Sequence, residues 1–253
     1  MKADRAAKNT LRCAVAILVA IGVAAAVGRA AFPADIVTRA DPLRERVMRA
    51  LHRDDPFASE RAAELDRFDS RYAAHRVAAV LHVLPGGLFL VLASLQFSSR
   101  IRSRFIQFHR RAGRLLVAVA FVMTVPALYF GLLMPYGGPG EAAAITLFGG
   151  LFLLTIGVGF AAIRKGQVAR HREWMIRAFA IALGISTVRI VGPVFDIALT
   201  PAGFRQPVLF VFAVWTGWIL TLAAAELWIR RTRSAESLLE PGTLNREPGT
   251  VHS

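Results

Sequence analysis

The segment from Leu115 to Met134, LLVAVAFVMTVPALYFGLLM, decides the fold class of this chain. It carries no charged side chain over twenty residues, which is about the length that crosses a bilayer as a helix. Its apolar side chains would occupy every side of that helix, whereas a surface helix of a soluble protein has a narrower apolar stripe. The segment therefore predicts a transmembrane helix.

Five further segments have the length and apolar character of a span. They are Leu11–Ala31, Ala73–Phe97, Ala142–Ile163, Trp174–Phe195 and Pro207–Ile229. The whole chain of 253 residues is 55% hydrophobic, with a mean hydropathy of +0.48. A soluble fold of this size cannot bury six such helices. The sequence thus predicts an all-α, polytopic membrane helix bundle with six transmembrane helices.

The charged residues lie in the connections between these segments and sort by side. The chain has 31 Lys and Arg against 17 Asp and Glu. Basic residues with few acids among them gather in four places, namely residues 1–12, 100–114, 164–172 and 230–233, whereas the eight Arg of residues 33–73 stand among nine Asp and Glu. The positive-inside rule then predicts that both termini are cytoplasmic, in a multi-pass protein of the bacterial inner membrane. The basic excess is a topology signal that also attracts anionic lipid headgroups, and it does not indicate nucleic-acid binding.

The pattern divides the chain into four parts. They are a transmembrane anchor over 1–32, an extracytoplasmic amphipathic segment over 33–73, a five-helix membrane core over 74–230 and a disordered cytoplasmic tail over 231–253. Asp41-Pro42 and Asp55-Pro56 resemble helix N-caps followed by Pro, and they predict two short helices in the second part. A solvated connector is the alternative. The first span also resembles a signal peptide, but its long apolar run favours a retained anchor.

Ionisable residues within a span are costly in lipid and are candidates for a functional role. His75 and His82 lie seven residues apart, which puts them on one face of a helix. Pro85 follows and predicts a kink with a freed carbonyl. Arg189 belongs by depth to the outer third of the fifth span, close to His82. These residues either line a polar path or simply tie helices together.

His109 and His171 form the sharpest pair in the sequence. They open the third and fifth spans on the same side of the membrane, at equivalent positions of two helices. Two imidazoles from two facing helices are what bis-His haem ligation requires, so both are candidate metal ligands. Arginines beside them are candidates for pairing with haem propionates; they are Arg110, Arg114 and Arg172. The alternative is that each His satisfies a loop carbonyl.

The strings FHRRAGR at 108–114 and HREWMIR at 171–177 carry a family resemblance. Together with His82 and Arg189 they resemble the bacterial predicted membrane proteins grouped as domain-of-unknown-function family 2306, over about residues 74–230. That resemblance implies topology and assigns no activity. A weaker resemblance is to haem b-binding membrane cytochromes, which also show His-x-x-x-Gly at the start of a span. Those proteins place four His at two depths, so this chain supports one haem b at most, through His109 and His171.

Three functions stay open at the level of sequence. The first is haem b-dependent electron transfer on the cytoplasmic side with a quinone or another electron partner, which would make the protein a membrane oxidoreductase. The second is a transporter or channel that uses His82 and Arg189. The third is a non-catalytic membrane partner or assembly subunit, since small residues at Ala16, Ala20, Ala24 and Gly28 indicate close helix packing. No G-x-S-x-G, H-E-x-x-H or phosphate loop occurs, so a hydrolase is disfavoured.

Overall fold

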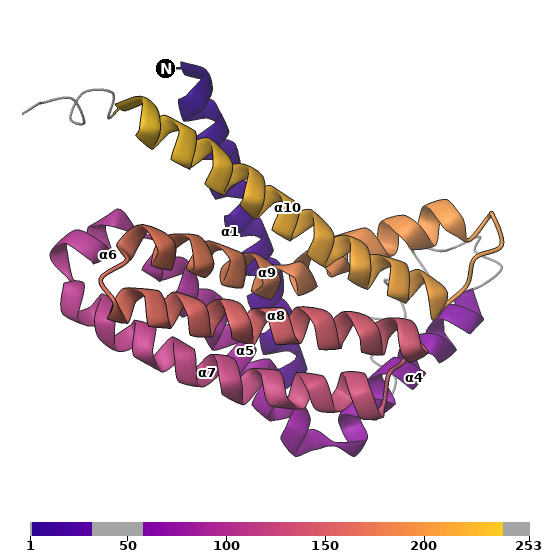
Figure 1. Ribbon diagram of the computed structural model, residues 1–253. Helices are drawn as coiled ribbons and strands as arrows, with labels where there is room; N and C mark the ends of the chain where they lie inside the picture. Colours follow the sequence, from indigo (N-terminus) through magenta and orange to yellow (C-terminus); the bar gives the residue numbers. More distant parts are fainter. Residues whose placement is uncertain (1, 32–57, 240–253) are drawn as a thin grey trace, which may run out of the picture.

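A computed structural model describes residues 2–31 and 58–239 of the chain, and these residues are helical apart from short turns (Figure 1). The helices are α1 (Lys2–Ala31), α4 (Ala58–Ala74), α5 (Arg76–Gln96), α6 (Ser99–Arg104), α7 (Ile106–Leu133), α8 (Gly138–Arg164), α9 (Val168–Leu199) and α10 (Val208–Leu239). Six of them, all except α4 and α6, are long and apolar enough to cross a membrane. The predicted all-α bundle with six candidate spans is therefore confirmed.

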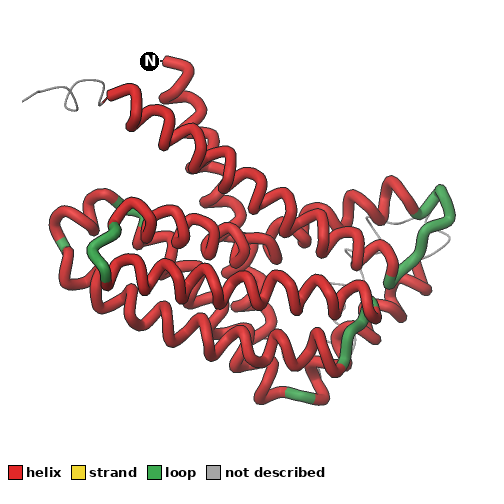
Figure 2. The backbone as a smooth tube through the Cα atoms, in the orientation of Figure 1, coloured by secondary structure: helices red, strands yellow, loops and turns green. Residues whose placement is uncertain are grey.

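Helices α5, α7, α8 and α9 run side by side as the body of the molecule, and α10 packs along α9 (Figure 1). The connections gather at the two ends of this body (Figure 2). One end carries α6 and the turn between α8 and α9, and we call it the basic end. The other carries α4 and the α7–α8 and α9–α10 connections, and we call it the α4 end. Helix α1 crosses the body at a steep angle and contacts α5 and α9 (Figure 1).

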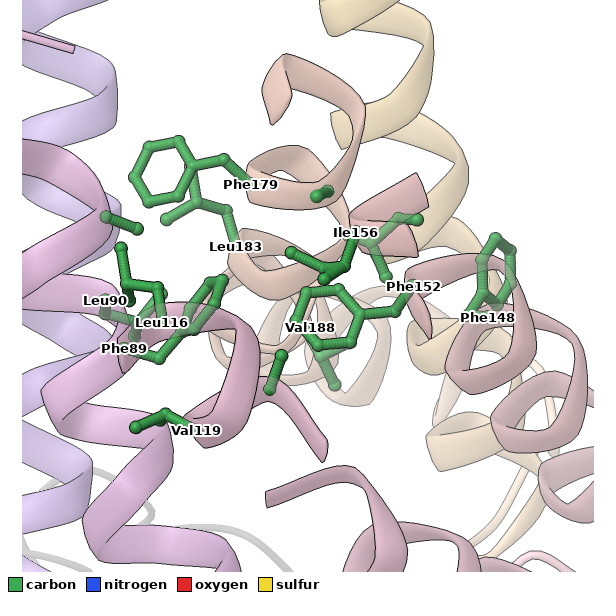
Figure 3. Packing of buried hydrophobic residues seen from close by; sticks show 14 of the residues in the cluster. Phe89, Leu90, Leu116, Val119, Phe148, Phe152, Ile156, Phe179, Leu183 and Val188 are labelled. Carbon is green, nitrogen blue, oxygen red and sulfur yellow. The ribbon is translucent and has the colours of Figure 1, made fainter. Parts of the chain in front are cut away.

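The core lies where the four body helices meet (Figure 3). Phe89 of α5 meets Phe152 of α8 edge to face, with ring centroids 5.4 Å apart. Leu116 and Val119 of α7 join from one side, and Val188 joins from α9. Because lipid is as apolar as these side chains, close packing rather than exclusion from water holds such helices together.

Helices α9 and α10 approach each other most closely at two glycines. A Cβ at Gly217 would lie 3.0 Å from the backbone oxygen of Gly184 and 3.0 Å from the backbone nitrogen of Val188. The indole of Trp218 fills the space over Gly184 and donates from Nε1 to the Ile181 carbonyl at 2.9 Å. Any side chain at Gly217 would therefore push the two helices apart.

Helix α1 does not use all of its small residues for packing within the chain. Gly22 is buried, and a Cβ there would lie 2.7 Å from Ser186 Oγ of α9. By contrast Ala16, Ala20 and Ala24 are exposed. The sequence predicted close packing along these alanines, but within this chain the contact is made by other positions of α1.

Three local predictions from the sequence can be compared with the structure. Helix α5 continues through Pro85 without a break in its helical assignment. A helix follows Asp55-Pro56, as α4, whereas the predicted helix after Asp41-Pro42 lies outside the described residues. Helix α10 continues to Leu239, although the tail was predicted to be disordered from 231. Residues 240–253 lie outside the described part of the chain.

Candidate functional site

The candidate site at the basic end is built on the tight turn between α8 and α9. Gly166 has a φ of 73°, in the left-handed region that favours glycine. The Gly166 amide donates to the Ile163 carbonyl and the Gln167 amide to the Ala162 carbonyl, at 3.1 and 3.0 Å. This is the hydrogen-bond pattern of a Schellman helix end. It reverses the chain at once, so that the first turn of α9 packs against the last turns of α8.

His171 lies in that first turn of α9 and is held against α8. Its Nδ1 lies 2.8 Å from the backbone oxygen of Gly159. A carbonyl only accepts, so Nδ1 carries the proton and Nε2 of the neutral ring carries the lone pair. Gly159 makes this contact possible, because a Cβ there would lie 3.2 Å from the Cβ of Trp174 and against the end of Met175. Nε2 is thus the nitrogen of His171 that can bind a ligand.

His109 lies in the first turn of α7, and one of its ring nitrogens lacks a hydrogen-bond partner in the described part of the chain. Its Nδ1 is buried and has no hydrogen-bond partner among the described residues. The same is true of Nε2 of Gln96, at the end of α5. Beside them Gly113 leaves open space, since the nearest side-chain atom to a Cβ there would be Gln96 Oε1, at 4.0 Å. Buried polar nitrogens without a partner are uncommon in folded proteins, so these two nitrogens distinguish this place from the rest of the bundle end.

The structure brings His109 and His171 to the same end of the bundle. The two rings lie within electrostatic range of each other, although they belong to α7 and α9. The arginines predicted beside them, Arg110, Arg114 and Arg172, are exposed at this end. Their role toward a bound group stays a prediction.

The other intramembrane residues singled out by the sequence have partners in the chain. His75 lies in the turn between α4 and α5 and not inside a span, so it does not share a continuous helix with His82. Its Nδ1 is 3.1 Å from the hydroxyl of Tyr129. His82 Nδ1 lies 2.8 Å from the Met123 carbonyl, and Arg189 donates to the Ile185 carbonyl at 3.0 Å. His82 and Arg189 lie within electrostatic range of each other.

A second polar cluster, at the α4 end, was not foreseen from the sequence. Arg71 of α4 donates to the Met134 carbonyl at 2.5 Å and lies 3.9 Å from the carboxylate of Glu141. Glu141 is only 4% exposed and accepts from the Gly137 amide at 2.6 Å. The Tyr136 hydroxyl donates to Glu64 at 2.8 Å. These contacts hold α4 across the connection between α7 and α8.

The same cluster ties α1 to α4. Arg29, near the end of α1, lies 2.5 Å from the carboxylate of Asp69, which is 7% exposed. The guanidinium of Arg29 also lies over the ring of Tyr72, 5.1 Å from its centroid. Burial raises the pKa of the Tyr72 hydroxyl above its ordinary value of 10.0, although Arg71 and Arg29 oppose the rise. Burial and the hydrogen bond to Glu64 likewise raise the pKa of Tyr136.

Sequence reasoning missed this cluster for an identifiable reason. Glu141 stands one residue before the predicted start of the fourth span, so it was counted as part of a loop. A lone acid in the first turn of an apolar helix was the available signal, because the membrane makes an unpaired carboxylate there costly. Its partner Arg71 is seventy positions earlier in the chain and carries no local signal.

The fold and both clusters describe a polytopic helical membrane protein. The family model for "Predicted membrane protein (DUF2306)" matches residues 79–229. The chain belongs to this family. No curated protein and no solved structure matches it. The family resemblance predicted from the two basic motifs is therefore confirmed, whereas the resemblance to haem b cytochromes gains no support from these comparisons.

Proposed function

We propose that this chain is a membrane electron-transfer protein that binds one haem b at the basic end through His109 and His171. One observation carries the proposal. The fold brings two imidazoles from two different helices to one end of the bundle, and each has a ring nitrogen not engaged by the described residues, Nε2 of His171 and Nδ1 of His109.

The donor set suits a haem better than a metal ion held by protein alone. Among the described residues no group of three or more His, Cys, Asp or Glu side chains stands ready for a metal. A protein-only metal site takes three or four such ligands, whereas a haem brings four nitrogens of its own and needs two axial ligands. Two histidines are therefore sufficient for a haem and insufficient for a zinc site.

Each residue would have a distinct role. His171 would present Nε2, with its orientation set by the Gly159 carbonyl on Nδ1, which is the usual outer-shell support of a ligating His. His109 would supply the second nitrogen. Arg110, Arg114 and Arg172 would pair with propionates in the aqueous layer. A bound haem supplies reversible one-electron chemistry, and its electron partner would be a quinone or another membrane subunit.

The proposal includes an orientation and a location. The basic stretches that contain no acid, at 100–114 and 164–172, lie at the end that carries α6 and the α8–α9 turn. By the positive-inside rule this end faces the cytoplasm, and both termini lie there, in a bacterial inner membrane. A cysteine placed at Arg104 should therefore be labelled by a membrane-impermeant maleimide only after the cells are opened.

An absorbance spectrum of the purified protein tests the haem proposal directly. We expect a Soret band and, after dithionite reduction, the α band of a b-type haem. His109→Ala and His171→Ala should each abolish the reduced α band. His75→Gln is the matched control, since His75 is at the α4 end, and it should leave the spectrum unchanged. A protein that shows no Soret band when expressed with added haem precursor would refute the proposal.

A second candidate function, a partner-binding or assembly subunit, is favoured by the exposed face of α1. Ala16, Ala20 and Ala24 lie exposed along that face, and small residues allow close helix contact in lipid. Cys13 is exposed on the same helix and can report such a contact by oxidative crosslinking. We expect crosslinked product in membranes, and we expect Ala20→Leu to abolish it. Persistence of the product in Ala20→Leu would argue against packing along this face.

A further inference from the structure

A charged groove lies at the basic end between α9 and α10, and His171 is not among the residues that line it. It has a volume of about 610 Å³ and is lined by Arg170, Glu173, Trp174, Arg177 and Arg233. The first four lining residues recur at a spacing of three and four, so they share one face of α9. Figure 1 shows α10 diverging from α9 toward its C-terminal end, which is where Arg233 contributes from the other wall.

Ion pairs build the walls of this groove. Arg177 grips Glu226 of α10 with two hydrogen bonds, at 2.5 and 3.0 Å, and lies over the Trp174 ring at 4.9 Å from its centroid. Arg233 makes a two-pronged pair with Glu173. Glu173 also lies 3.9 Å from Arg177. These contacts hold the aromatic ring and two guanidinium groups in fixed positions.

The charges in the groove do not cancel. Three arginines line it, whereas two carboxylates pair with them, Glu173 with Arg233 and Arg177 and Glu226 with Arg177, so one positive charge is left over. Arg170 is exposed, and no described side chain forms an ion pair or hydrogen bond with it. Arg170 lies in the first turn of α9, whose amino end adds the positive end of a helix dipole. The groove thus carries excess positive charge on side chains that ion pairs between α9 and α10 hold in place.

The position of the groove along the helices identifies its ligand. The candidate span of α9 begins at Val168 and that of α10 ends at Arg233, so the groove lies at the ends of both candidate spans. Tryptophan is enriched at that level of a membrane protein. The same two helices also carry exposed apolar side chains near this end, among them Val168 and Leu227. Phosphate with an acyl chain attached matches this combination of arginines, an aromatic ring and an adjacent lipid-facing surface.

We infer that this groove is a binding site for the phosphate headgroup of an anionic phospholipid, seated between α9 and α10. Arg170 and Arg233 would contact the phosphate, and Trp174 would lie against the glycerol backbone. The site is distinct from the haem proposal, because none of its lining residues is a proposed haem ligand or propionate partner.

The test uses the full-length protein in a neutral detergent and follows its melting temperature while dioleoyl phosphatidylglycerol is added. We expect a saturable rise in melting temperature with this lipid, and none with dioleoyl phosphatidylcholine. Arg170→Gln should weaken the apparent affinity about fivefold, the effect of one arginine near an anionic surface. Trp174→Leu should also weaken it. Arg111→Gln is the matched control, since Arg111 is exposed at the same end outside the groove.

Each outcome decides the proposal. Equal weakening in Arg170→Gln and Arg111→Gln would overturn it in favour of diffuse surface charge. A melting-temperature rise with 10 mM inorganic phosphate equal to that with the lipid would show a free-anion site instead. If a variant melts lower before lipid is added, native mass spectrometry of the folded fraction counts bound lipid directly. The proposal then requires fewer bound lipids in Arg170→Gln than in Arg111→Gln.

Discussion

The two ends of the bundle differ in whether their buried polar groups have partners within the chain. At the α4 end, Arg29 faces Asp69 and Arg71 faces Glu141, so cations and buried carboxylates are matched. At the basic end, His109 Nδ1 and Gln96 Nε2 are buried without a hydrogen-bond partner among the described residues. The α4 end thus pairs its polar groups to hold helices together, whereas the basic end combines such pairs, as between Arg177 and Glu226, with two buried nitrogens that lack a partner among the described residues.

This difference separates a structural polar cluster from a candidate binding site. A buried polar group costs free energy unless it is paired, so a chain that leaves several unpaired in one place either tolerates that cost or offsets it with a bound group. The number of charged groups alone does not distinguish a structural cluster from a binding site. What distinguishes them is whether the partners come from the same chain.

The largest expected effect comes from breaking the α4 end. Arg71→Met removes the cation beside Glu141 and leaves a carboxylate that is 4% exposed without a counter-charge. Removing one partner of a buried ion pair typically costs about 3–5 kcal/mol. SDS titration of the protein in mixed micelles should show a fall of that order in the free energy of unfolding.

Arg67→Met provides the control for that change. Arg67 is also on α4 and also pairs with a carboxylate, Glu64, but its side chain is 68% exposed. An exposed pair of this kind contributes about 0.5 kcal/mol or less. Equal losses in the two variants would mean that burial of the Arg71–Glu141 pair is not what stabilises the α4 end.

The next effect concerns the packing that positions His171 at the basic end. Gly159→Ala places a methyl group 3.2 Å from the Trp174 Cβ and against Met175, and crowding of this kind costs about 1–3 kcal/mol. Gly157→Ala is the control, because a Cβ there meets nothing within 4 Å. The control should unfold at equal or higher SDS than the parent, and Gly159→Ala at lower. If haem is bound, only Gly159→Ala should also shift its spectrum.

A smaller effect is the response of the α4 end to alkaline pH. The folded state raises the pKa of Tyr72 and Tyr136, so above about pH 10 the unfolded chain loses protons that the folded chain keeps. Stability contributed by these hydroxyls is therefore complete below about pH 10 and falls as pH rises toward the folded-state pKa. Unfolding at pH 8 and 10.5 should show this loss in the parent protein. A Tyr72→Phe, Tyr136→Phe double variant with an unchanged pH response would contradict it.

The smallest effect sharpens the comparison from the basic end. Gln96→Leu removes a buried donor that no described residue accepts from, so we expect a change in stability within about 1 kcal/mol, of either sign. A loss as large as that of Arg71→Met would show that Gln96 has a partner within the protein. In that case the two ends would not differ in the way described.

The number and type of the spans were predictable from the sequence because they rest on local composition. Twenty apolar residues in a row cross a bilayer whatever surrounds them, and all six predicted segments correspond to candidate spans. The boundaries were less predictable. His75 was assigned to the second span but lies in the turn before α5, since apolar composition continues across the end of α4.

The candidate site was predictable only in part. His109 and His171 were singled out because each opens a span after a basic loop, and the structure places them at one end. What the neighbouring residues contact could not be predicted, because it depends on which helices pack against them. HREWMIR is one continuous motif along the chain, yet its His171 lies against Gly159 of α8, whereas its Arg177 pairs with Glu226 of α10.

What the amino-acid sequence determined by itself is that this chain is a helical membrane protein whose unbalanced basic residues lie in the connections on one side. That follows from the preference of each apolar segment for lipid over water, which depends only on the composition of that segment. Only the tertiary structure decided which polar groups are paired, since partners such as Arg71 and Glu141 or Arg177 and Glu226 are far apart in sequence and meet through helix packing. Whether a polar group is paired depends on two helices that pack together, and no single stretch of the sequence contains both helices.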